Sequence, residues 1–436
     1  MFYRKIQRVL EEYYIDKSEP ILVINGARQI GKSFIIRETA QKKFKNYIEI
    51  NLQDDKNGNK LFEKVNNTES FYLILSSLYG ERLNNNEDTI VFLDEIQVYP
   101  QLISLLKPLR AENRYRYIAS GSLLGITLKH IFIPMGSIKE VRMYPMDFEE
   151  FLYANNVGKD VINYLKKCFD DRSSISESIH AVILRKFKEY LITGGLPDSI
   201  KAFITTKNIY KLRQIQTSIF NYYKDDASQY DMTNSLVVRK IYDSMLSYMA
   251  NKVKRLQYKK IEDIKDANYV RYNDEFEYLI NSGCAINAKA ISNPIFPLQE
   301  TMSKNLIKLY YNDVGILSNL LYRNNIDAIL NSDKNINLGS VYETACAMEL
   351  IAHGHDLYYF DSKKVGEVDF LINDYDILDA LPIEIKSGKD MNNFRAIPKL
   401  LKDPYNLKTG YIFNNSNEII IKDNLVKYPI YLIMFV

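Results

Sequence analysis

The residues best suited to chemistry lie near the N-terminus, in the run Gly26-Ala27-Arg28-Gln29-Ile30-Gly31-Lys32-Ser33. This run matches G-x-x-x-x-G-K-[ST], the pattern of a phosphate-binding loop. Gly26 and Gly31 permit backbone conformations in which successive N–H groups turn toward an anion. Lys32 supplies a positive charge for the β- and γ-phosphates, and Ser33 supplies a hydroxyl for Mg²⁺. The run therefore predicts binding of a nucleoside triphosphate such as ATP.

Two carboxylates follow a second chemically informative stretch. The apolar run that begins at Thr89 ends in Asp94 and Glu95. A buried strand of this kind delivers its final side chains to the carboxyl edge of the sheet, where ligands bind in open α/β folds. We expect Asp94 to hold Mg²⁺, directly or through water, and Glu95 to polarise the attacking water. The alternative is a strand that is simply followed by surface acids.

A pair of serines follows the next apolar run. Ser120 and Ser122 flank Gly121 directly after the stretch that starts at Arg116. A polar residue at the tip of the strand beside the Asp-Glu strand is placed to sense the γ-phosphate, so Ser120 and Ser122 are candidate sensors. A Ser-Gly-Ser sequence is also compatible with a plain turn.

These side chains need a sheet to position them, and the pattern of apolar runs predicts one. Short runs rich in β-branched residues indicate buried parallel strands. The helix that begins at Lys32 would present its N-terminus to the phosphates. We therefore predict an α/β fold with a parallel sheet; its strands are expected at 21–24, 47–52, 89–95, 116–119 and around Val141 and Met143.

The middle of the chain is predicted to be mainly helical. Residues 147–225 are expected to form a helical lid over the nucleotide, interrupted at 194–197. The following helices and an expected β-hairpin at 285–291 and 306–311 describe a winged helix-turn-helix. The window 252–265 is the most basic part of the chain. It could meet nucleic-acid phosphates or form a solvated helix face.

A candidate second site lies in the last third of the chain. Glu384 and Lys386 are two residues apart on an expected strand and so share a face. Asp369 on the neighbouring strand could join Glu384 in holding Mg²⁺, while Lys386 polarises a water, and Glu343 on the preceding helix could complete the site. This D…E-x-K arrangement is that of restriction-endonuclease-like folds. The alternative is a retained fold used for binding, in which Asp369 and Lys386 pair electrostatically.

Composition sets limits on the class of protein. The chain has 436 residues, a net charge of +3 and 46% hydrophobic residues. These values are typical of a globular protein with several domains and exclude an overall basic footprint for nucleic acid. The three cysteines are widely spaced, which favours reduced thiols. No apolar run is long enough to span a membrane, so we expect a cytoplasmic protein without a membrane partner.

Taken together, the chain resembles a prokaryotic family of AAA-type P-loop ATP-binding proteins with an uncharacterised C-terminal domain related to restriction endonucleases. The resemblance implies a P-loop ATPase core (1–146), a helical lid (147–230), a winged-helix-like domain (231–312) and a restriction-endonuclease-like domain (313–436). Many relatives carry Arg where this chain has Ser137, so the resemblance identifies no arginine finger. Its marks in this sequence are the phosphate-binding loop, Leu93-Asp94-Glu95-Ile96-Gln97, Ser120-Gly121-Ser122, Tyr144 to Phe151, Gly194-Gly195-Leu196-Pro197, Tyr311 to Leu317, and the segments containing Asp369 and Glu384.

The leading functional hypothesis is an ATP hydrolase that uses Mg²⁺ and whose nucleotide state moves the C-terminal domains. Nucleic acid is the expected client, with DNA as the candidate, and a protein partner is a further option. Two other hypotheses stay open at this point: a nucleotide-gated binding or scaffold protein with little turnover, and an ATP-regulated, metal-dependent nuclease. The oligomeric state does not follow from the sequence.

Overall fold

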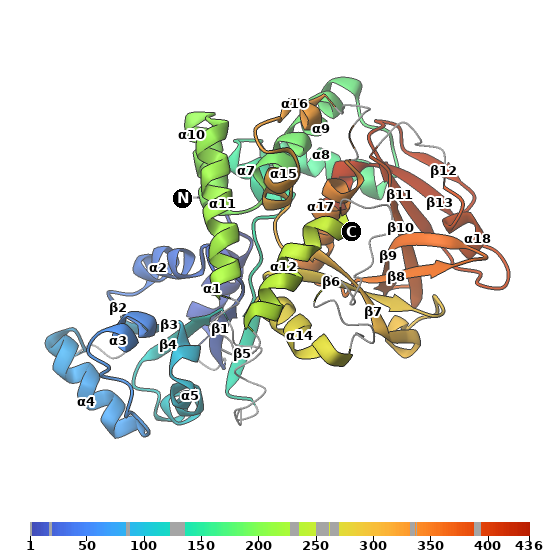
Figure 1. The fold of residues 1–436 in the computed structure, drawn as a ribbon. Coiled ribbons are helices and arrows are strands. Elements are labelled where there is room, and N and C mark those ends of the chain that lie inside the picture. The colour runs from blue at the N-terminus through green and yellow to red at the C-terminus, as the bar shows by residue number, and fades with distance from the viewer. Residues whose placement is uncertain are drawn as a thin grey trace. The chain divides into compact units, whose positions relative to one another are not determined.

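The computed structural model describes residues 2–16, 20–83, 88–122, 136–226, 235–249, 261, 270–331, 336, 338–387 and 394–436. It divides into two compact units (Figure 1). The first contains residues 3–144 with 281–283, and the second contains residues 145–280 and 284–436. Each unit is described separately below.

The first unit is built on a five-stranded sheet in the order β2-β3-β4-β1-β5. All four pairings between neighbouring strands are parallel. Every residue of β1 and of β3 is buried, as expected for strands that are covered on both faces. The structure thus confirms the predicted α/β class with a parallel sheet. The strands are β1 (Ile21–Asn25), β2 (Asn46–Asn51), β3 (Thr89–Asp94), β4 (Arg116–Gly121) and β5 (Ile138–Arg142).

Helices connect these strands and bury apolar faces against the sheet. In α5, for example, Leu102, Leu105, Leu106 and Leu109 are all buried, at helical spacing. A short connection joins α2 to β2, and this helix packs against its strand. The helical segments of the unit are α1 (Ile6–Ile15), α2 (Lys32–Lys43), α3 (Leu52–Asn57), α4 (Thr68–Tyr79), η1 (Gly80–Leu83), η3 (Ile96–Val98) and α5 (Pro100–Glu112).

The second unit begins with a group of helices. The predicted helix start at Asp147 is confirmed, because its side chain accepts a hydrogen bond from Glu150 N in a capping box. Among the described residues, no helix is long and apolar enough to cross a membrane. The helical segments are α7 (Phe148–Ala154), α8 (Lys159–Asp170), α9 (Glu177–Thr193), α10 (Pro197–Thr206), α11 (Ile209–Asp226), α12 (Ser235–Met249), η6 (Val270–Tyr272), α14 (Asn273–Asn281), η7 (Leu298–Thr301), α15 (Val314–Tyr322), α16 (Asp327–Leu330), α17 (Gly339–Ala352), α18 (Ile397–Leu400) and η8 (Ile430–Phe435).

A buried aspartate joins distant parts of this helical group. Asp313 is fully buried, and its two carboxylate oxygens accept hydrogen bonds from Gly195 N at 2.6 Å and Ile316 N at 3.0 Å. Burial raises the pKa of Asp313 to about 6, against the opposing effect of these backbone donors. The Gly-Gly-Leu-Pro segment and the Asn-Asp-Val-Gly segment are therefore two halves of one structural junction.

The second unit also contains an eight-stranded mixed sheet, ordered β12-β13-β11-β10-β9-β8-β6-β7. The hairpin expected as the wing of a winged helix is β6–β7, and it forms one edge of this sheet. It joins the C-terminal strands because β6 pairs in parallel with β8. The basic window 252–265 lies outside the described residues except for Ile261. The strands are β6 (Ala285–Ile291), β7 (Met302–Tyr311), β8 (Tyr358–Ser362), β9 (Gly366–Asp374), β10 (Asp379–Ile385), β11 (Gly410–Asn414), β12 (Ile420–Lys422) and β13 (Leu425–Pro429).

Candidate nucleotide-binding site

The phosphate-binding loop connects the end of β1 to the start of α2, as the sequence predicts. Gly26 has a φ of +153°, and a Cβ at this position would lie 2.3 Å from Met143 O. Gly31, the residue before α2, has a φ of +92°. Both positions therefore need glycine, the first because the loop passes directly over the backbone that follows β5.

Lys32 is 5% exposed and points back into the loop. Its Nζ donates hydrogen bonds to Gly26 O at 2.9 Å and Ala27 O at 2.8 Å. Arg4 supports the loop from outside, since its guanidinium donates to Ile30 O at 2.9 Å and Tyr144 O at 2.7 Å. This role of Arg4 could not be predicted from the sequence, because the pattern around Arg4 indicates only an amphipathic helix.

Asp94 lies at the end of β3, next to the first residues of α2. Its Oδ2 accepts a hydrogen bond from Ser33 Oγ at 2.8 Å, and its Oδ1 accepts one from the Ser120 hydroxyl. Burial raises the pKa of Asp94, and the two hydroxyl donors act in the opposite direction. The structure thus brings Ser33, Asp94 and Ser120 together from three different elements.

Glu95 follows in a left-handed backbone conformation, with φ 55° and ψ 47°. This conformation is uncommon for a residue other than glycine and ends the strand abruptly. The Glu95 Oε2 atom accepts a hydrogen bond from Gln97 Nε2 at 2.5 Å and another from Ser122 Oγ at 3.1 Å. Ser122 therefore contacts Glu95, whereas Ser120 contacts Asp94. Gln97 belongs to the Leu93–Gln97 segment, and no role for its side chain could be predicted from the sequence.

Arg114 and Arg116 precede the serine pair closely in the sequence but lie away from this edge of the sheet. Arg116 begins β4, and its guanidinium lies over the Tyr13 ring at 3.8 Å from the ring centre. Arg114 lies over the Tyr72 ring at 4.2 Å. The serines come at the other end of β4, so Arg114 and Arg116 belong to the opposite edge of the sheet.

The candidate second site is partly assembled in the second unit. Lys386 Nζ lies 2.6 Å from Glu384 Oε1, and Asp369 Oδ2 accepts a hydrogen bond from Ile385 N at 2.8 Å. Burial raises the pKa of Glu384, while Lys386 acts to lower it. Glu343 is buried on α17. Among the described residues there is no group of three or more His, Cys, Asp or Glu side chains arranged to hold a metal ion.

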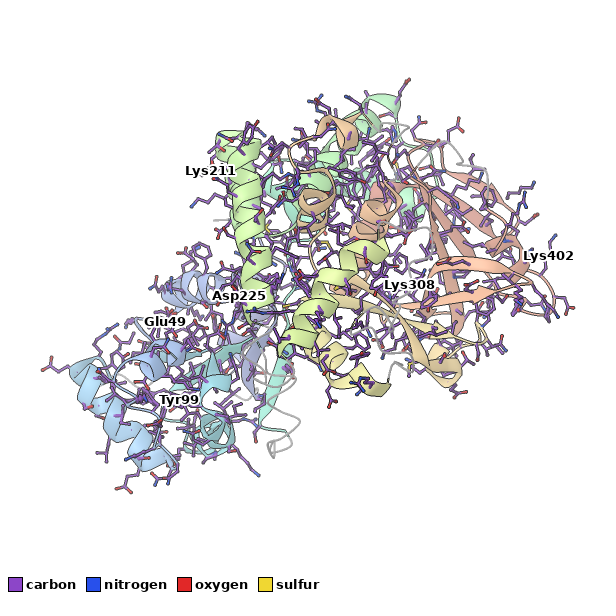
Figure 2. The ribbon with its side chains drawn as sticks, in the orientation of Figure 1. Glu49, Tyr99, Lys211, Asp225, Lys308 and Lys402 are labelled. Atoms are coloured by element: carbon purple, nitrogen blue, oxygen red, sulfur yellow. The ribbon has the colours of Figure 1, made fainter. Side chains whose placement is uncertain are left out.

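A nearby buried lysine also has an acidic partner. Lys308 of β7, labelled in Figure 2, is 1% exposed and pairs with Glu367 of β9. A buried ammonium is costly unless it is paired, so this contact is structural.

Three segments of the chain match known family profiles. Residues 18–152 match the profile described as "AAA domain". The P-loop geometry and the strand order agree with that match. The N-terminal unit has an AAA-type P-loop fold. Residues 184–327 and 338–433 match two profiles described as "Domain of unknown function (DUF8612)" and "Domain of unknown function (DUF4143)".

Comparisons with whole proteins give more distant similarities. No curated protein matches the sequence. The walker-type ATPase paby2304 of Pyrococcus abyssi is 11% identical with a TM-score of 0.42, covering 76% of this chain and 96% of that chain. The Hsp104–ADP complex of S. cerevisiae is 11% identical with a TM-score of 0.29, covering 80% of this chain and 44% of that one.

Proposed function

We propose that this protein binds and hydrolyses ATP. The observation that carries the proposal is the convergence of four groups at the carboxyl edge of the five-stranded sheet. These are the glycine-bounded loop, Lys32, the Ser33–Asp94 pair and Glu95. Each is of the type that phosphoryl transfer to water requires, and the AAA domain match supports the assignment.

We assign the residues separate roles in binding the phosphates, holding Mg²⁺ and activating water. The loop N–H groups and the α2 N-terminus bind the phosphates, and Lys32 exchanges its loop carbonyls for phosphate oxygens. Ser33 and Asp94 offer the hydroxyl and carboxylate oxygens that suit Mg²⁺, and they lie within 2.8 Å of each other. Bound Mg²⁺ would neutralise charge on the phosphates. Glu95 accepts the proton of the attacking water, and Ser120 fixes the orientation of Asp94.

The nucleotide state would act on the second unit. A triphosphate can shift a conformational equilibrium only by the difference between its binding free energies for the two states. We propose the helices that follow Asp147 as the lid, and DNA as the client. The DNA assignment rests on the nuclease-like pattern of the C-terminal strands and is a fold analogy.

Replacing Lys32 with Met tests the phosphate-binding step. The side chain keeps its length but loses its charge, so we expect Mg·ATP affinity to fall by about 100-fold, the value of a buried charge-assisted contact. Binding of a fluorescent ATP analogue and steady-state phosphate release, each with and without DNA, give the measurement. The exposed residue Lys42, on the same helix, provides the matched control Lys42→Met.

The outcomes separate the hypotheses. Phosphate release that rises with DNA supports a nucleic-acid-coupled ATPase, and release that ignores DNA favours a protein client. Tight ATP binding with no release in either condition would contradict hydrolysis and favour the scaffold hypothesis. Binding that survives Lys32→Met would contradict the assignment of the loop.

A metal-dependent nuclease is the second candidate, favoured by the contact of Lys386 with Glu384 beside Asp369. This candidate predicts Mg²⁺-dependent nicking of supercoiled DNA that is lost in Glu384→Gln and kept in the exposed variant Glu418→Gln. If the plasmid stays intact after incubation with the wild type, the nuclease candidate is contradicted and the Lys386–Glu384 ion pair has a structural role only.

A further inference from the structure

We propose that the helical hairpin formed by α10 and α11 contacts the phosphate backbone of DNA. The inference rests on the proposed function, because it takes DNA as the client, and it adds the surface that would bind it. The candidate nucleotide-binding site and the candidate second site lie on other elements of the fold.

The hairpin carries an excess of positive charge. Residues 199–224 include five basic residues and no acidic residue. Three of the basic residues are lysines with exposed side chains, namely Lys201, Lys207 and Lys211. Within the described part of the chain, none of these three lysines has a carboxylate at ion-pair distance, whereas two basic side chains of α9 pair with Glu189. The charge of the hairpin therefore remains available to an anionic partner.

The connection between the two helices holds one of these charges in place. Lys207 follows α10 in a left-handed backbone conformation, with φ 52° and ψ 16°. Its Nζ lies 4.4 Å from the centre of the ring of Phe203, which is buried. An aromatic face attracts an ammonium group without neutralising it. The contact therefore positions a full positive charge at the tip of the hairpin.

Exposed polar side chains continue from this tip along one side of α11. The helix has 18 residues, so it is about 27 Å long. Spacings of three or four residues place the following exposed side chains in one stripe: Lys211, Gln214, Ser218 and Asn221. Ammonium, amide and hydroxyl groups are the side-chain groups that contact DNA phosphates. Phosphates repeat about every 3.4 Å along a strand, so the stripe can meet several of them. Figure 2 labels Lys211 and Asp225, which lie near the two ends of α11.

A buried arginine adds positive charge beneath the stripe. Arg213 is 5% exposed, and its guanidinium donates to Arg323 O at 2.7 Å and to Gln216 Oε1 at 2.8 Å. Both acceptors are uncharged. Burial lowers the pKa of Arg213 to about 10, so the guanidinium stays protonated near neutral pH. Its charge therefore adds to that of Lys207 and Lys211.

The uncharged part of the stripe distinguishes DNA from other anionic partners. A helix that binds an anionic membrane needs a broad apolar face, and this side of α11 carries amides and a hydroxyl instead. An acidic protein offers carboxylates at irregular positions. A straight row of donors about 27 Å long instead matches a partner whose acceptors repeat along a line, as phosphates do in a DNA strand.

Replacing both Lys207 and Lys211 with Gln tests this surface. At about 0.1 M salt we expect the affinity for duplex DNA to fall at least tenfold, because two phosphate contacts are lost. The slope of log affinity against log salt concentration should become shallower by about two, since each contact contributes nearly one. Fluorescence anisotropy of a short fluorescein-labelled duplex of mixed sequence, titrated with the full chain at several salt concentrations, measures both quantities.

Two matched double variants serve as controls. Lys159→Gln with Lys167→Gln removes the same charge at exposed positions of α8, so DNA affinity should stay within about twofold of the wild type. Lys207→Arg with Lys211→Arg keeps the charge of the hairpin and should bind within about threefold of the wild type. Urea unfolding followed by circular dichroism should give the same midpoint for all of these variants, because the replaced side chains are exposed.

The outcomes separate this surface from the proposed function. Unchanged affinity and slope after the two Gln replacements in the hairpin, or an equal loss in the α8 control, would overturn the hairpin as the DNA surface and leave DNA as a client. Displacement of the duplex by polyglutamate at equal charge concentration would overturn it in favour of an acidic protein. A wild type that binds no DNA would overturn both the surface and the DNA assignment. ATP hydrolysis is measured independently, by phosphate release without DNA.

Discussion

Replacing Glu95 with Gln is expected to reduce kcat for ATP hydrolysis by about 100-fold or more, the usual contribution of a general base. The amide has the same shape as the carboxylate but cannot take the proton of the attacking water. Binding of Mg·ATP should stay within a few-fold of the wild type, because Lys32, Ser33 and Asp94 are unchanged. Steady-state phosphate release gives kcat, and binding of a fluorescent ATP analogue gives affinity.

The control for this substitution is Glu81→Gln, at an exposed residue of η1, which changes the net charge by the same amount. It should leave both quantities unchanged. Turnover that persists in Glu95→Gln would remove Glu95 from the chemistry and leave the scaffold hypothesis or another base to be considered. A parallel loss of affinity would instead indicate that the substitution disturbs the loop through Ser122.

The substitution Gly195→Ala is expected to destabilise the second unit by more than about 4 kcal/mol, a value reached when a new atom overlaps backbone that cannot move. A Cβ at this position would lie 2.1 Å from Met146 O and 2.8 Å from Met146 N. Moving the segments of Met146 and Gly195 apart would break hydrogen bonds. Met146 N donates to Gly195 O at 2.7 Å, and Asp313 accepts from Gly195 N at 2.6 Å. Urea unfolding followed by circular dichroism measures the loss.

Gly158→Ala provides the contrast. Gly158 has an ordinary φ of −69°, and a Cβ there would meet no atom within 4 Å. The variant should unfold within about 0.5 kcal/mol of the wild type, as surface substitutions usually do. Equal urea midpoints for the two variants would contradict this prediction. They would show that the segments containing Gly195 and Met146 can move apart without a large loss of stability.

Much of the candidate site could be predicted from the sequence because its signals are local. The spacing of Gly26, Gly31, Lys32 and Ser33 specifies a loop between strand and helix, since only that backbone path suits those residues. The apolar run before Asp94 predicts a buried strand with a carboxylate at its tip. Parallel strands then place their carboxyl ends at one edge, so Asp94 and the Ser120-Gly121-Ser122 segment are expected beside the phosphate-binding loop.

Contacts that depend on register could not be predicted in this way. Whether Ser120 or Ser122 faces Asp94 is set by the pairing of β3 with β4, in which Leu93 is opposite Ala119. The use of Gln97 as a donor to Glu95 depends on the left-handed turn at Glu95. No periodicity in the sequence signals either contact.

The sequence by itself determined the class of the N-terminal unit, its loop chemistry and the identity of the acidic pair. Only the tertiary structure decided that Arg4 supports the loop, that Gln97 and Ser122 share one oxygen of Glu95, and that the β6–β7 hairpin joins the sheet of the C-terminal strands. The reason is physical. Local backbone preferences act over a few residues, whereas these contacts join residues whose proximity follows from strand order and packing across the whole unit.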